Sequence, residues 1–310
     1  MLKTTVTANA KINLFLDITG RRGDGYHTIT GVMQAVSLAD AVTVEITEPV
    51  GMHLCVMGPR PGAAETITLT CSNPDLPTDR RNLAWRAAEA FFAATGRGCR
   101  TLSIHIDKHI PASAGMAGGS TDAASVLSAL NELFDHPLTP AALCEVGLTL
   151  GADVPFCIMG GAQITEGVGE RLTPLPTLPD CTLVVACAGE GVSTPGAYKA
   201  LDGMYGGFAP EAYTPRLAQL DRLTAALRGG DLDGVCGSMF NIFEAAVLPE
   251  RPVARMIKET LLSAGAVAAM MSGSGPSVFG VFSKGDGGVQ RALDALKERE
   301  IPAWVCVPMA

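Results

Sequence analysis

The feature that most constrains this chain is a run of small residues at positions 111–122, with the sequence P-A-S-A-G-M-A-G-G-S-T-D. Alternating apolar residues predict a strand at 101–107, and an apolar stripe predicts a helix at 120–134. Glycines let backbone N–H groups turn toward an oxyanion, and a helix start offers unpaired N–H groups and the positive end of the helix dipole. The segment therefore predicts a phosphate-binding loop that opens a helix.

This loop follows neither of two common nucleotide-binding patterns. Both G-x-x-x-x-G-K-[ST] and G-x-G-x-x-G are absent, and no Lys follows the glycines. The alternative is a plain flexible turn in which Asp122 or Ser120 caps the helix. The run of small residues between a strand and an amphipathic helix favours phosphate binding, to which Ser120 and Thr121 could add hydroxyl donors or a magnesium ligand.

Composition limits the class of protein. With 310 residues, 47% of them hydrophobic and only 5% aromatic, the chain can bury one large or two medium domains with mainly aliphatic cores. A net charge of −8 disfavours nucleic acid and anionic membranes but allows an anionic small molecule. Nine Cys without a C-x-x-C pair, no signal-peptide start and no apolar run of about 18 residues predict a reduced, cytoplasmic protein.

Strands and helices are mixed along the whole chain. Loose alternation predicts strands around a bend at 4–18, and clearer alternation predicts strands at 41–46, 66–71, 101–107, 182–186, 277–282 and 304–307. Helices are predicted at 81–95, 120–134, 140–150, 218–227, 253–264 and 289–299. Gly and Pro punctuate residues 162–179, which predicts an N-terminal domain at 1–165 and a C-terminal domain at 166–310.

Three stretches together resemble the signatures of the GHMP kinases, the family named for galactokinase, homoserine, mevalonate and phosphomevalonate kinases. Residues 8–14 are similar to the first signature, the glycine loop to the second, and residues 271–277 to the third. They follow in the family's order, so the resemblance covers nearly the whole chain. It implies an α+β fold of two domains with the active site in the cleft between them, and an ATP-dependent kinase of a small molecule.

Four further stretches, at 10–16, 20–27, 150–156 and 166–170, resemble one member of this family. The resemblance implies an alcohol acceptor that carries a cytidine diphosphate moiety, and a step toward isoprenoid precursors. Met116 stands where Leu is usual and Thr121 where Ser is usual, and both keep size and chemistry. The expected partner is a small-molecule substrate, and neither nucleic acid nor a membrane is expected to bind. The protein is expected to be a monomer or a weak homodimer.

The resemblance implies two catalytic residues, Lys11 and Asp153. Asp153 would accept the proton of the acceptor hydroxyl as the bond to phosphorus forms. The Lys11 ammonium would hold Asp153 ionised and offset developing charge. Spacing alone favours a plainer role for Asp153, as a helix N-cap shortly before Pro155. The plainer role for Lys11, a solvated strand lysine, is weakened by a neighbourhood otherwise free of charge.

ATP is expected with Mg²⁺, and Ser120 is the expected protein ligand of the metal. The expected ATP-binding residues are Pro111, Ala112, Ser113, Ala114, Gly115, Met116, Ala117, Gly118, Gly119, Ser120 and Thr121, together with Asn82 and Lys108. The third motif contributes Gly273, Ser274 and Gly275. Its glycines would let the loop approach the nucleotide or stabilise the site beside it.

Acceptor recognition is expected at Asn13, Tyr26, His27, Thr194 and Tyr198. Asn13 would hydrogen-bond the acceptor beside Lys11. Tyr26 would stack on the cytosine, and His27 would bond its polar edge. Tyr198 would close the other side of the base, although an aromatic residue at a helix start is often only packing.

Two rival functions remain open at this point. Another GHMP kinase, of the homoserine or mevalonate type, would not need Tyr26 and His27 beside the first signature. A nucleotide-binding regulator that has lost its chemistry predicts a damaged Lys11 or Asp153, and both residues are present.

Overall fold

The computed structural model describes residues 1–50, 62–285 and 287–310. The chain divides into two compact units, and each is assembled from separate segments of the sequence. Unit 1 consists of Met1–Ala10, Ala39–Ile110 and Ala117–Met159, and unit 2 of Lys11–Leu38, Pro111–Met116 and Gly160–Ala310. The predicted domain boundary after residue 165 stays a prediction, because compact units and family domains are different divisions of a chain.

Two long strands, β1 (Leu2–Arg21) and β2 (His27–Val50), contribute to both units. The predicted bend within 4–18 is wrong, because β1 is one continuous strand. Residues 10–18 are buried without interruption. A strand covered on both faces does not alternate between apolar and polar residues, which explains why its pattern was loose.

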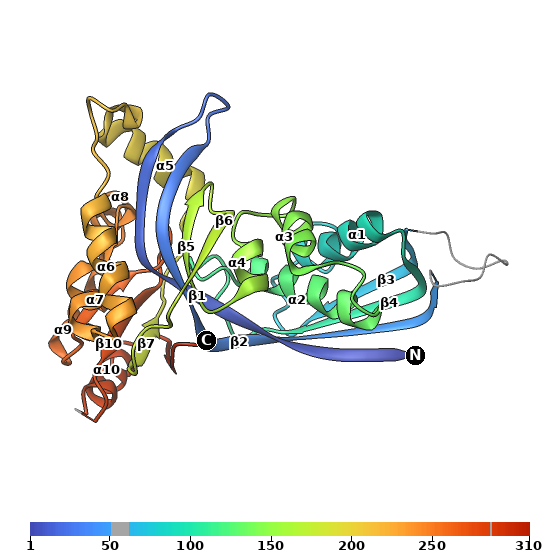
Figure 1. Cartoon of the computed structure of the whole chain (residues 1–310). Helices are drawn as coiled ribbons and strands as arrows, with labels where there is room; N and C mark the ends of the chain where they lie inside the picture. Colours follow the sequence, from blue (N-terminus) through green and yellow to red (C-terminus); the bar gives the residue numbers. More distant parts are fainter. Residues whose placement is uncertain (51–61, 286) are drawn as a thin grey trace. The chain divides into compact units, whose positions relative to one another are not determined.

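In unit 1, helices cover one face of a sheet (Figure 1). Strand β3 (Ala64–Cys71) pairs in parallel with β4 (Gly98–Asp107), and β4 pairs antiparallel with β2 from Ala41↔Asp107 onward. The covering helices are α1 (Leu83–Thr95), α2 (Gly118–Leu133), α3 (Pro140–Leu148) and α4 (Val154–Met159). Their core includes Val42 and Val44 from the sheet and Phe91 and Phe92 from α1.

Unit 2 contains two groups of paired strands. Strand β5 (Ala162–Gly167) pairs antiparallel with β2 and with β6 (Arg171–Leu175), and β8 (Phe240–Asn241) pairs in parallel with β1. An antiparallel sheet has the order β11-β7-β10-β9, with bounds Ala303–Cys306, Thr182–Ala186, Val278–Phe282 and Ala268–Met271. Every residue of β10 is buried, which makes this sheet the centre of the unit 2 core.

The helices of unit 2 are α5 (Thr194–Met204), α6 (Leu217–Gly229), α7 (Leu232–Ser238), α8 (Phe243–Val247), α9 (Pro252–Ser263) and α10 (Gly288–Lys297). Short 3₁₀ turns lie at Gly206–Phe208 and Leu248–Glu250. Helices α9 and α10 pack against the antiparallel sheet (Figure 1). Ser193 caps α5 by accepting from the Gly196 N–H group, as a serine before a helix-start proline predicts.

The long predicted elements are confirmed, with small differences at their ends. Helices α1, α2, α3, α6, α9 and α10 and strands β3, β4, β7, β10 and β11 lie where alternation or an apolar stripe predicted them. The first half of β2 and the short elements β5, β6, β8, β9, α7 and α8 were not predicted, and for α4 and α5 only a helix start was indicated, near Pro155 and Tyr198. Short or fully buried segments carry too few periods for a pattern to be recognised.

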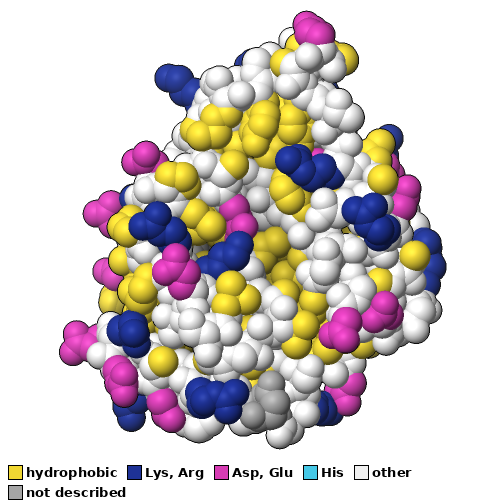
Figure 2. Space-filling view, turned by 90° about the vertical axis from the view of Figure 1, so that its left-hand side faces the viewer, with side chains coloured by type: hydrophobic (Ala, Val, Ile, Leu, Met, Phe, Trp, Pro, Cys, Tyr) yellow, Lys and Arg dark blue, Asp and Glu magenta, His cyan; other side chains and the backbone are white. Residues whose placement is uncertain are grey.

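The surface carries charges of both signs. Figure 2 shows acidic and basic side chains interspersed over the face that it draws. Among the described residues, no helix combines the length and the apolar character needed to cross a bilayer.

Candidate active site

Lys11 is a buried cation in the part of β1 that belongs to unit 2, with 4% of its surface exposed. Its Nζ donates to Asn13 Oδ1 at 2.7 Å and to the Gly115 carbonyl oxygen at 3.0 Å. Residues two apart on a strand share a face, which explains how the order A-K-I-N brings the ammonium and the amide together. The alternative of a solvated lysine is therefore wrong.

The third-motif loop, which we define as residues 272–276, packs directly on the glycine loop. Ser272 Oγ donates to the Gly115 carbonyl oxygen at 3.0 Å. Gly115 has a φ of +76°, and a Cβ added there would lie 2.2 Å from the Ser272 carbonyl oxygen. Gly273 has a φ of +56°, and a Cβ added there would lie 3.2 Å from Lys11 Nζ. Residues from all three signatures thus meet around Lys11 within unit 2.

Backbone hydrogen bonds hold the first part of the glycine loop in unit 2. The Lys11 N–H group donates to the Met116 carbonyl oxygen at 3.2 Å, and the Ser277 N–H group donates to the Ala114 carbonyl oxygen at 3.3 Å. Residues 114–116 are therefore tied both to β1 and to the residue that precedes β10.

The second part of the glycine loop opens α2 in unit 1. Ala117 is the N-cap, with a φ of +60° and no side-chain cap hydrogen bond, so neither Ser120 nor Asp122 caps the helix. Thr121 is buried, and its Oγ1 donates to the Asn9 carbonyl oxygen at 2.9 Å. Ser120 is half-buried in the first turn. The Thr121 hydroxyl thus anchors α2 to β1, and Ser120 is the hydroxyl better placed for a ligand.

Lys108 joins two carboxylates inside unit 1. Its Nζ lies 2.5 Å from Asp40 Oδ2 and 2.8 Å from Asp122 Oδ2, and no side chain of the three is more than 5% exposed. Burial by itself would lower the pKa of Lys108. The two carboxylates raise it by more, so the pKa of Lys108 is raised overall. Burial raises the pKa of Asp122 to about 7, aided by Asp40 and opposed by Lys108. The predicted contact of Lys108 with ATP stays a prediction.

Asn82 has a structural role at the start of α1. Its Oδ1 accepts from the Ala84 N–H group at 3.0 Å, and its Nδ2 donates to the Pro77 carbonyl oxygen at 2.8 Å. Its predicted contact with adenine or ribose stays a prediction.

Asp153 lies in unit 1 immediately before α4 and is half-buried. Its carbonyl oxygen accepts from the Cys157 N–H group at 3.1 Å, which is the first hydrogen bond of a helix. The N-cap position that spacing predicted is therefore present. The role of Asp153 as a base toward Lys11 and the acceptor stays a prediction.

His27 lies in an aromatic cluster of unit 2. The Tyr198 ring stacks on it with centroids 4.6 Å apart and planes inclined by 15°. Phe208 meets the His27 ring edge to face at 5.6 Å, and Phe243 meets Tyr198 in the same way at 4.9 Å. Tyr26, by contrast, is 67% exposed. His27 and Tyr198 are thus brought together, beside an exposed aromatic neighbour.

The remaining predicted acceptor-site residue, Thr194, is linked to the third-motif loop. Its Oγ1 lies 2.9 Å from Ser274 Oγ, a distance at which either hydroxyl can donate. The start of α5, which carries Tyr198, is therefore tied to the loop that contacts Gly115.

Asp202 is a site residue that sequence reasoning missed. Its Oδ1 lies 2.7 Å from His27 Nε2, and its Oδ2 lies 3.5 Å from an Arg21 guanidinium nitrogen. An ionised carboxylate can only accept, so this contact directs an Nε2–H group of His27 toward Asp202. The two residues are 175 positions apart, and no local pattern connects them.

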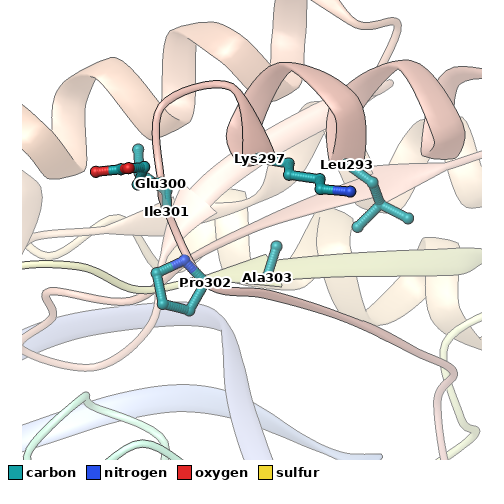
Figure 3. Close-up of a pocket in the computed structure, with 6 residues that line it drawn as sticks. All are labelled: Leu293, Lys297, Glu300, Ile301, Pro302 and Ala303. Carbon is teal, nitrogen blue, oxygen red and sulfur yellow. The ribbon is translucent and has the colours of Figure 1, made fainter.

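A pocket of about 360 Å³ lies elsewhere in unit 2 (Figure 3). It is lined by Leu293 and Lys297 of α10, by Glu300, Ile301 and Pro302 of the segment that follows, and by Ala303, the first residue of β11. No signature residue lines it, and its polar lining is one lysine and one glutamate. The signature residues, rather than this pocket, define the candidate active site.

Two family models match the chain. The model described as GHMP kinases N terminal domain matches residues 82–161, and the model described as GHMP kinases C terminal matches residues 223–301. The fold and the meeting of the three signatures agree with these matches. Fold and site thus define a GHMP kinase, and the predicted α+β fold and family are confirmed.

Relatives narrow the family further. A 4-diphosphocytidyl-2-C-methyl-D-erythritol kinase of Alkaliphilus metalliredigens is 39% identical, over 91% of this chain and 89% of that protein. One of Synechococcus sp. is 40% identical, over 98% and 94%. A crystal structure of 4-(cytidine 5'-diphospho)-2C-methyl-D-erythritol kinase has a TM-score of 0.76 and 32% identity, covering 99% and 100%. The chain belongs to the 4-diphosphocytidyl-2-C-methyl-D-erythritol kinase family.

Proposed function

We propose that this chain transfers the γ-phosphoryl group of ATP to a hydroxyl on the erythritol part of 4-diphosphocytidyl-2-C-methyl-D-erythritol. This reaction is a step in the methylerythritol phosphate route to isoprenoid precursors. The observation that carries the proposal is the contact of Lys11 Nζ with Gly115, together with the close approach of Gly273. Similarity to kinases of that name along more than 90% of the chain supports the substrate.

The ATP phosphates are proposed to bind residues 111–121. Ala117 supplies no side-chain acceptor to the first N–H groups of α2, so these groups can donate to phosphate oxygens. A Cβ at Gly118 would lie 3.2 Å from Lys108 Nζ and from Ile110 Cγ2. The glycine therefore keeps the backbone of the loop open where a larger residue would crowd it.

Lys11 is proposed to stabilise the charge that develops on the transferred phosphoryl group. Its ammonium is held by two acceptors at 2.7 and 3.0 Å, so little reorganisation is needed when the reaction occurs. Asp153 is proposed to accept the proton of the attacking hydroxyl. The same residue also holds the N-cap position of α4, where its carbonyl oxygen accepts from the Cys157 N–H group at 3.1 Å.

Mg²⁺ is proposed to accompany ATP. Among residues 1–50, 62–285 and 287–310, no group of three or more His, Cys, Asp or Glu side chains could hold a metal ion. The glycine loop, with its Ser120 hydroxyl, fits an ion that is held mainly by phosphate oxygens and water and has Ser120 as its protein ligand. Such an ion, when bound, neutralises charge on the phosphates.

The cytidine group is proposed to bind at Tyr26, His27 and Tyr198. Exposed Tyr26 offers a ring face for stacking on the base. Asp202 Oδ1 lies 2.7 Å from His27 Nε2 and thereby orients the His27 ring. The opposite edge of the ring can then meet the polar edge of cytosine. Asn13, held by Lys11, is proposed to contact the erythritol part.

An ADP-release assay with a panel of alcohols tests the proposed function. We expect turnover with 4-diphosphocytidyl-2-C-methyl-D-erythritol and none with homoserine or mevalonate. Turnover of homoserine or mevalonate without turnover of the cytidyl compound would refute the proposed substrate. A chain that binds ATP but turns over no alcohol would instead support the regulator.

A further inference from the structure

Asn241 is a buried side chain that reaches the third-motif loop from another element. It is 3% exposed and ends β8, where it is in register with Leu16 of β1. Its Nδ2 donates to the Met271 carbonyl oxygen at 2.7 Å and to the Gly273 carbonyl oxygen at 2.8 Å. Its Oδ1 accepts from the Phe243 N–H group at 3.0 Å. Both amide protons and the amide oxygen are thus engaged.

Glu244 completes the hold on the same loop. Its Oε1 accepts from the Met271 N–H group at 2.9 Å, and its Oε2 accepts from Lys258 Nζ at 2.6 Å. Both backbone polar groups of Met271 are therefore fixed by side chains from residues 241–244. Two hydrogen bonds to this segment hold Met271, and a third holds Gly273 inside the loop that follows.

From the loop, the contacts continue to the catalytic cation. Ser272 Oγ and Lys11 Nζ both donate to the Gly115 carbonyl oxygen, each at 3.0 Å. Gly273 approaches so closely that an added Cβ would lie 3.2 Å from Lys11 Nζ. A displacement of residues 272–273 would therefore move an acceptor of the ammonium and a wall of its site.

We propose that Asn241 is a positioning residue for phosphoryl transfer. By fixing the carbonyl groups of Met271 and Gly273, it holds Ser272 against Gly115 and thereby sets the place of the Lys11 ammonium. The inference rests on the proposed function, because it assumes that Lys11 takes part in the reaction. A misplacement of about 1 Å at a reacting group can lower a rate by about 100-fold.

The first test is Asn241→Asp. The variant keeps the size of the side chain and an acceptor for Phe243, but a carboxylate cannot donate to the Met271 and Gly273 carbonyl oxygens. With the cytidyl substrate and ATP, we expect kcat to fall by about 10- to 100-fold while both KM values change by less than about 3-fold. Wild-type turnover is measured first, so that failure of the proposed function is seen before any variant is interpreted.

Asn131→Asp is the matched control. Asn131 is 7% exposed, and it donates to the Leu138 carbonyl oxygen and accepts from the Leu138 N–H group, both at 3.0 Å. It lies in unit 1 and outside the three signatures. We expect it to lose thermal stability comparably to Asn241→Asp and to keep the wild-type kcat.

A double-mutant cycle separates positioning from a general structural role. If Asn241 acts through Lys11, then Asn241→Asp should lower the residual rate of Lys11→Met by less than about 2-fold. Ser272→Ala, which removes the hydroxyl on Gly115 at little risk to folding, should also lower kcat. The inference would be overturned by a wild-type kcat in Asn241→Asp or in Ser272→Ala. It would also be overturned if Asn241→Asp lowered the rate of Lys11→Met by the same factor by which it lowers the wild-type rate.

Discussion

Lys11 and Lys108 are both buried cations with identified partners. Lys108 lies against the carboxylates of Asp40 and Asp122, and Lys11 donates to the amide oxygen of Asn13 and the carbonyl oxygen of Gly115. The partners of Lys108 are 68 and 14 positions away, so no local pattern could predict them. The Lys11–Asn13 pair could be predicted, because two-residue spacing on a strand places both side chains on one face.

Asp153→Asn tests the proposed base. Asn caps a helix about as well as Asp, so the fold should be kept. Asn cannot accept the proton of the hydroxyl, so turnover should fall by about 100-fold or more while ATP still binds. The measurements are ADP release and ATP titration by calorimetry. Near-normal turnover in a variant that binds ATP would remove the base assignment.

Asp122→Asn tests the buried carboxyl pair through pH. Burial raises the pKa of Asp122 from its ordinary value of 3.8 to about 7 in the folded protein. The folded state binds the Asp122 proton more tightly than the unfolded state does. The contribution of protonated Asp122 to the free energy of unfolding is therefore complete below pH 3.8 and is lost as pH rises through about 7. The free energy of unfolding of the variant relative to wild type should therefore increase from about pH 5 to about pH 8.

Urea unfolding at several pH values measures this difference, and Asp79→Asn is the control. The side-chain hydrogen bond from Arg81 lowers the pKa of the exposed Asp79 to about 2, so its titration lies below the tested range. The Asp79→Asn difference should stay flat with pH. An equally flat difference for Asp122→Asn would contradict the raised pKa.

At the scale of elements, close backbone contact explains why glycine is needed in the signature loops. Gly115→Ala would put a Cβ 2.2 Å from the Ser272 carbonyl oxygen, and Gly115 has a φ of +76°. The loop must therefore move, and with it an acceptor of Lys11. We expect turnover to fall by about 10-fold or more, measured by ADP release.

Gly96→Ala is the control for Gly115→Ala. Gly96 ends α1 with a φ of +65°, but a Cβ added there would meet nothing within 4 Å. This variant should lose about 1 kcal/mol in free energy of unfolding from backbone strain and keep wild-type turnover. Normal turnover in Gly115→Ala would show that the contact between the two loops is not needed for activity.

The sequence predicted the glycine loop and α2 well, because a strand, small residues and an amphipathic helix follow one another there. It could not predict the contacts of the third-motif loop with Gly115, because Ser272 and Gly115 are 157 positions apart. Only the family resemblance connected them. Asn241 and Asp202 were missed for the same reason, since neither lies in a signature.

At the scale of the whole molecule, β1 and β2 each contribute to both compact units. Composition and a Gly- and Pro-rich segment can suggest one boundary in sequence, but they do not reveal strands shared between units. Residues 11–38 belong to the same unit as the third motif, and this arrangement brings Lys11 to Gly115 and Gly273. The site in unit 2 therefore depends on contacts between distant parts of the chain.

The central claim is phosphoryl transfer to the cytidyl acceptor, and phosphorus NMR of the reaction tests it most directly. The chain is incubated with ATP, Mg²⁺ and 4-diphosphocytidyl-2-C-methyl-D-erythritol, and the spectrum is followed with time. We predict a new phosphomonoester signal that grows in step with ADP and is lost in Lys11→Met and Asp153→Asn. ADP that appears with inorganic phosphate and no phosphomonoester, or no ADP at all, would contradict the account.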